Sequence, residues 1–195
     1  MTSLVGLAAV YLLAVNVLLG LLMSARYNPW RRWPHRRINI LKLHNWTAYV
    51  ALGLSLLHPI PLLFVPKPRF RFADIVVPLH SPEQPRINTV GAIALYLLIF
   101  TVVTSYFRAE IGRQRWKLLH YLTYVVAGLV VFHGSVTDQH LNDSPLDLLD
   151  AEKVSIIVCG VVVAMAAAFR FRWTKKHPKY RPPARRGSRV GTNSQ

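Results

Sequence analysis

Five apolar segments, each near the length that a helix needs to cross a bilayer, constrain the fold of this chain more than any other feature. Inside a membrane only helices and closed barrels satisfy their own backbone hydrogen bonds. The sequence therefore predicts an all-α integral membrane protein, a bundle of five transmembrane helices within residues 1–173, followed by a basic cytoplasmic tail over 174–195 that we expect to be disordered. The five segments cover residues 4–23, 41–65, 90–107, 116–136 and 154–169.

Charged and apolar residues are segregated along the chain. Hydrophobic residues make up 52% of it, yet the formal net charge is +16, a combination that soluble chains of 195 residues rarely show. A strongly basic composition often indicates nucleic-acid binding, but here the basic residues flank the apolar segments. We therefore expect a lipid bilayer as partner and no nucleic acid. The single cysteine, Cys159, excludes an internal disulfide and a CxxCH haem attachment.

The basic residues also predict the orientation in the membrane. If the segments alternate in direction, one side receives 19 of the 24 Lys and Arg residues, and the other side receives seven of the eight acids. This positive-inside bias predicts an external N-terminus and a cytoplasmic C-terminus. The expected location is the plasma membrane, the inner membrane in a bacterium. The first segment lacks a positive n-region and is longer than the apolar part of a signal peptide, so we expect a retained helix, with Asn16 facing a neighbouring helix.

Four histidines lie inside the apolar segments as two pairs. His44 and His58 belong to the second segment, and His120 and His133 to the fourth. An imidazole in hydrocarbon needs a partner, and the iron of a porphyrin accepts two imidazoles. Because the two segments run in the same direction, His44 lies level with His120 and His58 with His133. The bundle is therefore expected to enclose two stacked b-type haems, an inner one and an outer one, with these pairs as axial ligands.

The spacing of each pair tests this prediction. Fourteen residues leave His58 about 40° from the face of His44, whereas the thirteen residues between His120 and His133 leave a phase error of roughly 140° on a straight helix. A tightened turn, a kink or a rotated haem has to absorb that error, and Gly128 is a candidate place for it. Gly53 and Gly128 also lie between the ligands, where a flat macrocycle can approach the backbone, although small residues serve ordinary helix packing equally well.

Other residues near the histidines suggest contacts with the haems. Basic residues at the cytoplasmic ends could bind the inner haem's propionates, or they could only set topology and contact lipid phosphate. Trp116, one turn before His120, either packs on the inner haem or belongs to an aromatic belt. Pro59 after His58 predicts a kink or an end of the helix. His80 and His140 are interpreted as solvated loop residues in preference to a metal site. The basic candidates are Arg36, Arg37, Arg113, Arg115 and Lys117.

The sequence around the histidines resembles a known family. The pair spacings, Leu-His-Asn-Trp around His44 and Trp116-x3-His120-x3-Tyr124 are similar to the ferric reductase-like transmembrane domain, clearly over residues 38–136 and loosely beyond. This family includes the membrane cores of NADPH oxidases and ferric reductases, and the haem-binding subunit of the bacterial periplasmic methionine sulfoxide reductase system. The resemblance implies a dihaem core that moves electrons across a membrane, with the four histidines as axial ligands.

The chain differs from the oxidases because it carries no flavin or nicotinamide domain and no GxGxxG phosphate loop. We therefore expect the core or subunit of an oxidoreductase, with a separate cytosolic flavin reductase or membrane quinol as electron donor. The acceptor is expected to be an external small molecule or a periplasmic protein. Two alternatives remain open. One is a quinol-linked cytochrome b anchor of a larger respiratory or periplasmic reductase complex, and the other is a packing or assembly protein whose histidines are only hydrogen-bonded.

Overall fold

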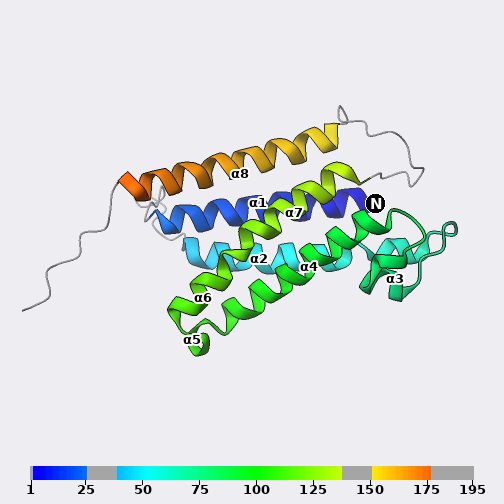
Figure 1. Ribbon diagram of the computed structural model, residues 1–195, viewed down its shortest axis with the longest axis horizontal. Helices are drawn as coiled ribbons and strands as arrows, with labels where there is room; N and C mark the ends of the chain where they lie inside the picture. Colours follow the sequence, from blue (N-terminus) through cyan, green and yellow to red (C-terminus); the bar gives the residue numbers. More distant parts are fainter. Residues whose placement is uncertain (1, 26–38, 138–150, 177–195) are drawn as a thin grey trace, which may run out of the picture.

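The computed structural model describes residues 2–25, 39–137 and 151–176, and every regular element in these ranges is a helix (Figure 1). Arg36, Arg37, His140 and most of the predicted tail lie outside the described residues. The long helices are α1 (Thr2–Ser24), α2 (Ile40–Leu57), α4 (Pro85–Tyr106), α6 (Arg113–His120), α7 (Leu122–Val136) and α8 (Ala151–Lys176). The short ones are η2 (Ile60–Phe64), α3 (Phe72–Val76), η3 (Pro78–His80) and α5 (Arg108–Ile111).

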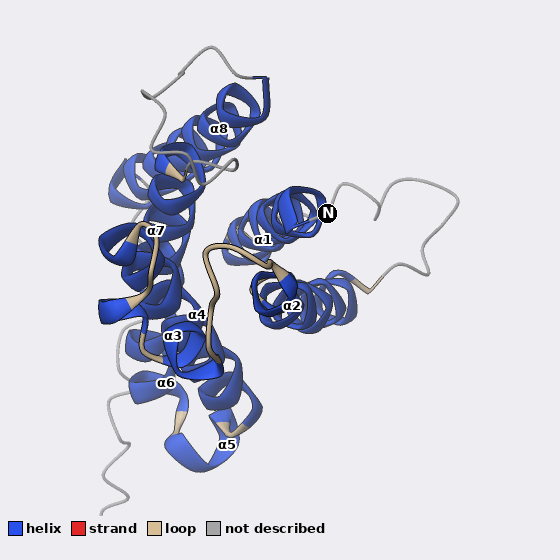
Figure 2. Ribbon diagram, turned by 90° about the vertical axis from the view of Figure 1, so that its right-hand side faces the viewer, coloured by secondary structure: helices blue, strands red, loops and turns tan. Residues whose placement is uncertain are grey.

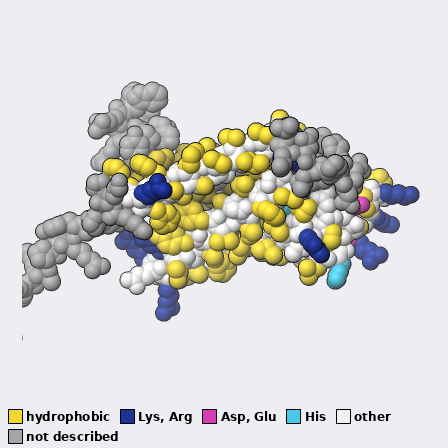
Figure 3. Space-filling view, turned by 45° about the horizontal axis from the view of Figure 1, so that its top comes forward, with side chains coloured by type: hydrophobic (Ala, Val, Ile, Leu, Met, Phe, Trp, Pro, Cys, Tyr) yellow, Lys and Arg dark blue, Asp and Glu magenta, His cyan; other side chains and the backbone are white. Residues whose placement is uncertain are grey.

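Five helical segments are long and apolar enough to cross a membrane, which confirms the five predicted spans and makes this a multi-pass membrane protein. Many large apolar side chains lie on the outside of the bundle, as lipid contact requires. Figure 3 shows hydrophobic side chains along the length of the bundle and Lys and Arg side chains gathered at its two ends. The segments cover Leu4–Ser24, Ile40–Phe64, Pro85–Tyr106, Arg113–Val136 and Ala151–Trp173.

The helices pack as two pairs joined by the last helix. Helix α1 packs on α2, α4 packs on α7, and α8 lies against both α1 and α7 (Figures 1 and 2). Polar contacts hold α8 to α1 near both ends. The Tyr11 hydroxyl is 2.7 Å from Oγ of Ser155, and Arg170 donates to Oγ of Ser24 at 2.9 Å and to its carbonyl oxygen at 2.6 Å. Since that carbonyl is at the C-terminus of α1, Arg170 caps the helix.

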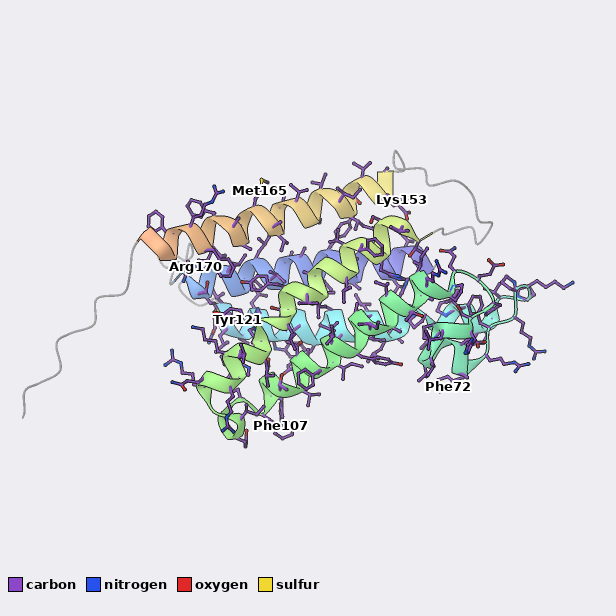
Figure 4. The ribbon with its side chains drawn as sticks, in the orientation of Figure 1. Phe72, Phe107, Tyr121, Lys153, Met165 and Arg170 are labelled. Carbon is purple, nitrogen blue, oxygen red and sulfur yellow. The ribbon has the colours of Figure 1, made fainter. Side chains whose placement is uncertain are left out.

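The fourth span is interrupted directly after His120. Helix α6 ends there, α7 begins at Leu122, and Tyr121 lies at the junction (Figure 4). The Tyr121 N–H donates to the Leu118 carbonyl at 3.2 Å, which is a tighter, three-residue turn. Such a turn rotates more per residue than an α-helix and so removes part of the phase error between His120 and His133. Gly128 lies within the continuous α7, so the expectation that it marks the deviation is wrong.

Proline ends the second helix as predicted. Helix α2 stops at Leu57, and the His58 N–H makes its last α-type bond, to the Leu54 carbonyl at 2.9 Å. The α-helical hydrogen bonding stops at Pro59 because proline has no N–H to donate. The chain then continues as the 3-10 helix η2. His58 therefore lies at the point where the chain leaves the bundle helix and turns toward η2, α3 and η3, which cover that end of the molecule.

A buried apolar layer crosses the middle of the bundle. Each of four helices contributes one side chain to it, namely Leu13 of α1, Ala51 of α2, Leu98 of α4 and Val126 of α7. Ala51 has no exposed surface, so its methyl group is fully enclosed by neighbouring side chains. The layer holds the two helix pairs together, because it is the one buried cluster to which both pairs contribute among the described residues.

Ala51→Leu is therefore expected to destabilise the bundle, by about 1–3 kcal/mol, because the larger side chain overpacks a closed layer. Unfolding in detergent, followed by circular dichroism, measures the effect. The matched control is Ala164→Leu on α8, where the same substitution falls on an exposed position and is expected to change stability little. Equal losses in both variants would contradict the role of the layer.

Candidate functional site

The two histidines predicted to form the inner pair face each other in the structure. His44 comes from α2 and His120 from the end of α6, and their ring centroids are 6.2 Å apart with an interplanar angle of 70°. A metal–imidazole bond is about 2 Å long and the ring centre lies roughly 1 Å behind the nitrogen, so two imidazoles on opposite sides of one metal place their centroids about 6 Å apart. The observed separation fits one iron between the two rings.

The two histidines predicted to form the outer pair line one cavity. His58 and His133 lie in its wall, which is otherwise mostly apolar and is built by α1, α2, α4 and α7. Residues of η2, α3 and η3 also line it, as does Phe70, which lies between η2 and α3 and is 4% exposed. The cavity has a volume of about 450 Å³, within the range of small-molecule and cofactor sites. The chemistry of this lining, mostly apolar with two imidazoles, fits a porphyrin.

Backbone carbonyls orient two of the four imidazoles. Nδ1 of His44 is 3.0 Å from the carbonyl oxygen of Asn16 on α1, and Nδ1 of His133 is 3.0 Å from that of Ile87 on α4. A carbonyl can only accept, so the hydrogen bond assigns the proton to Nδ1 and leaves the lone pair on Nε2. Histidines that bind metals through Nε2 use this arrangement, in which the second nitrogen donates to a fixed acceptor.

A serine orients His120 in the same way. Oγ of Ser105 lies 3.2 Å from Nδ1 of His120, accepts from Nε1 of Trp116 at 3.3 Å and donates to the Thr101 carbonyl at 2.7 Å. The single hydroxyl proton is used on Thr101, so His120 must donate from Nδ1. Trp116 also stacks on His120, with centroids 5.0 Å apart and planes inclined by 27°. Its predicted contact with a haem stays a prediction.

Asn16 joins the first two helices at the inner site. Its side-chain amide donates to the His44 carbonyl at 2.5 Å and to Oγ1 of Thr47 at 2.9 Å, while its own carbonyl accepts from the His44 ring. The prediction that Asn16 faces a neighbouring helix is confirmed. One residue of α1 therefore holds both the backbone and the imidazole of His44.

Three glycines that the sequence analysis did not select lie against the imidazoles. A Cβ at Gly6 would be 2.8 Å from His58, one at Gly91 would be 2.7 Å from His133, and one at Gly20 would be 3.4 Å from His44. A signal for them exists in the sequence. Gly6 and Gly20 are fourteen residues apart, as are Gly91 and Ser105, and this is the spacing of His44 and His58. Residues that face the histidines therefore recur at the same interval on α1 and α4.

The remaining residues that the sequence suggested as haem or metal contacts have few close neighbours in the structure or are exposed. A Cβ at Gly53 or Gly128 would meet nothing within 4 Å, so neither glycine is needed for close helix contact, and their approach to a macrocycle stays a prediction. Arg113 and Lys117 are exposed on α6, and their contact with propionates stays a prediction. His80 is exposed, and in the described part of the chain no three His, Cys, Asp or Glu side chains converge on one point.

The buried layer separates the two histidine pairs. Ala51 is seven residues from both His44 and His58, and Val126 lies six residues after His120 and seven before His133. Leu13 and Leu98 take the same midpoints on α1 and α4, between Gly6 and Gly20 and between Gly91 and Ser105. Seven residues make about two helical turns, so all these residues share one inward face. The geometry is that of two sites at different depths with an apolar partition between them.

Comparison with known proteins gives one match. A family model described as the ferric reductase like transmembrane component matches residues 5–131, which confirms the resemblance found in the sequence. The matched range begins in α1, so it includes the helix that carries Gly6, Asn16 and Gly20. No match to the chain was found among curated proteins or among solved structures.

Asn16→Leu is expected to destabilise the protein by about 0.5–2 kcal/mol, because it removes two hydrogen bonds between α1 and α2 within the membrane. Chemical unfolding in detergent measures the loss. Ser135→Ala is the control, since within the described part of the chain the Ser135 hydroxyl bonds the Phe132 carbonyl of its own helix, at 3.0 Å. A control that loses as much stability as Asn16→Leu would refute a specific role of the contact between the helices.

Proposed function

Because the chain belongs to the ferric reductase-like transmembrane component family, we propose that it is a b-type dihaem protein that carries electrons across a membrane. In this proposal His44 and His120 hold an inner haem, and His58 and His133 hold an outer haem. Single electrons pass from a cytoplasmic donor through these two sites to an external acceptor. Family membership itself implies transmembrane electron transfer by a component of an oxidoreductase; the ligands and the direction belong to the proposal.

One observation carries the proposal. The rings of His44 and His120 face each other across 6.2 Å, while each Nδ1 is turned outward to an acceptor on a flanking helix. Two histidines that served only as hydrogen-bonding groups would not need to face each other. A single metal ion bound by both rings requires that they do. A haem bound here supplies a ferric–ferrous couple that accepts and releases one electron.

The chain's own residues determine what such a site can do. His44 and His120 would hold the iron of the inner haem with their two imidazoles, and a site held in this way would carry out electron transfer and would not bind oxygen. The layer of Leu13, Ala51, Leu98 and Val126 excludes water between the two depths. No charged side chain belongs to that layer. It therefore separates the two sites without placing a fixed charge on the proposed route of the electron.

The proposed direction rests on charge. The exposed residues Arg113, Arg115 and Lys117 lie on α6, at the end of the bundle that carries His44 and His120, and the positive-inside rule assigns this end to the cytoplasm. A basic surface there favours association with an acidic flavin reductase, and a membrane quinol is the other proposed donor. The acceptor would approach the opposite end, which η2, α3 and η3 cover, as an external small molecule or a periplasmic protein.

Haem content of histidine variants tests the proposal. The wild-type protein is expected to hold two b-type haems, measured by absorption spectroscopy and haem quantification. His44→Ala, His120→Ala and the double variant of both should each hold about one haem, since either substitution removes the same iron site. His44→Ala combined with His133→Ala should hold none, because it damages both sites. His80→Ala, at an exposed position, is the control that should keep two haems.

Two results would contradict parts of this scheme. A wild-type protein that is folded but colourless despite ample haem supply would favour the interpretation that the histidines are only hydrogen-bonded. A His44→Ala/His120→Ala variant without any haem would show that the pairs are assigned wrongly. Reduction of the purified protein by quinol, and stable co-purification with a redox subunit, would favour the cytochrome b anchor of a larger respiratory or periplasmic reductase complex.

Ser105→Ala is expected to raise the reduction potential of the inner haem. Without an acceptor for its Nδ1–H, the His120 imidazole would be less basic and would donate less electron density to the iron. The ferric state would then be less stabilised relative to the ferrous state. A redox titration followed by absorption measures the shift. Thr104→Val is the matched control, because the neighbouring Thr104 hydroxyl donates only to carbonyls of its own helix, at 2.8 and 3.1 Å. An unchanged potential in Ser105→Ala would show that the serine does not act through His120.

A further inference from the structure

Helices α1 and α4 contact the outer histidines through glycine. A Cβ on Gly6 would stand 2.8 Å from Cε1 and 2.9 Å from Nδ1 of His58. On the other side of the cavity, a Cβ on Gly91 would stand 2.7 Å from Cε1 and 2.9 Å from both ring nitrogens of His133. Carbon atoms do not approach this closely without repulsion, so any larger residue at either position would push an imidazole into the cavity or force two helices apart.

The position of the glycine explains how a helix carbonyl becomes free to accept from the ring. Gly91 follows Ile87 by four residues, and Gly20 follows Asn16 by four, and these are the two carbonyls bonded to His133 and His44. A helical Cβ leans toward the N-terminus, over the carbonyl one turn earlier. At Gly91 the absent Cβ is what lets the His133 ring reach that oxygen, whereas at Gly20 a Cβ would leave room for the His44 ring.

The inner site is less closely confined. A Cβ on Gly20 would be 3.4 Å from Cε1 and 3.8 Å from Nδ1 of His44, which is ordinary van der Waals contact. The other inner ring, His120, is backed by the Ser105 side chain and not by a glycine. The two sites therefore differ: both rings of the outer pair require a missing side chain behind them, and the rings of the inner pair do not.

We propose that Gly6 and Gly91 are positioning residues that set the separation and the orientation of the outer pair, His58 and His133. The inference rests on the proposed function, because it assigns a role to these glycines only if that pair binds a haem. By letting α1 and α4 approach the rings closely, the glycines fix where each imidazole lies in the wall of the cavity. The positions of His58 and His133 then depend directly on how closely α1 and α4 pack against them.

Gly160 is an example of a glycine that serves only the packing of two helices. A Cβ at Gly160 would be 2.9 Å from Cγ1 of Val131, so this glycine serves the contact between α8 and α7 and touches no histidine. Gly160→Ala therefore introduces the same methyl group and a similar clash as Gly91→Ala without a ligand ring in the way. It is the matched control for the proposal.

The experiment compares alanine variants in full-length protein purified in detergent with its haems. Gly6→Ala and Gly91→Ala are each expected to lose the low-spin electron paramagnetic resonance signal of one haem and keep the other. Gly20→Ala and Gly160→Ala should keep both signals. In the His44→Ala/His120→Ala background, where only the outer haem is expected, Gly91→Ala should abolish the remaining low-spin signal. Unchanged spectra in Gly6→Ala and Gly91→Ala, or the same loss in Gly160→Ala, would overturn the inference.

A second measurement does not depend on the haem and covers a variant that folds poorly. If the added methyl group acts by striking His133, removal of that ring should relieve it, so Gly91→Ala/His133→Ala should unfold at the same temperature as His133→Ala alone. A double variant that unfolds at a lower temperature than His133→Ala alone would contradict the proposal. A wild-type protein without haem would refute the proposed function, whereas a wild-type protein with two haems and insensitive glycine variants would refute only this inference.

Discussion

The hydrogen bond between the Nδ1–H of a histidine and the neighbouring helix is the interaction on which the rest of this structure depends. In hydrocarbon a polar ring cannot remain unpaired, and here the pairing oxygens belong to α1 for His44 and to α4 for His120 and His133. Each bond does three things at once. It satisfies a polar group, joins two helices of the bundle, and assigns the proton to Nδ1, which leaves the lone pair on Nε2.

A common period of seven residues converts these local bonds into two sites at two depths. Two helical turns return a side chain to nearly the same face, so His44, Ala51 and His58 lie along one line of α2. The flanking helices repeat this rule with Gly6, Leu13 and Gly20 on α1. The four helices share this register, so their apolar side chains meet in the middle layer. The histidines and their hydrogen-bond partners meet on either side of it.

The fourth span departs from a straight helix at a residue that the sequence did not indicate. The thirteen-residue spacing correctly required a departure from a straight helix, but Gly128 was the wrong place for it. The break occurs at Tyr121, next to His120, although tyrosine carries no local signal for ending a helix. His120 is held there by Ser105 and Trp116, so contacts between helices decide where the chain tightens. Pro59, by contrast, ended α2 as expected, because proline breaks a helix through its own chemistry.

The sequence by itself determined the five spans, the two pairs of histidines and the family, because hydropathy, charge and motif spacing are properties of the chain read in one dimension. Only the tertiary structure decided which residues lie behind each ring. Gly6 and Gly91 look like any small residues of a membrane helix, and Ser105 like any membrane serine. Their contacts with the histidines exist because α1 packs on α2 and α4 packs on α7, and the choice of neighbouring helix follows from packing over the whole bundle.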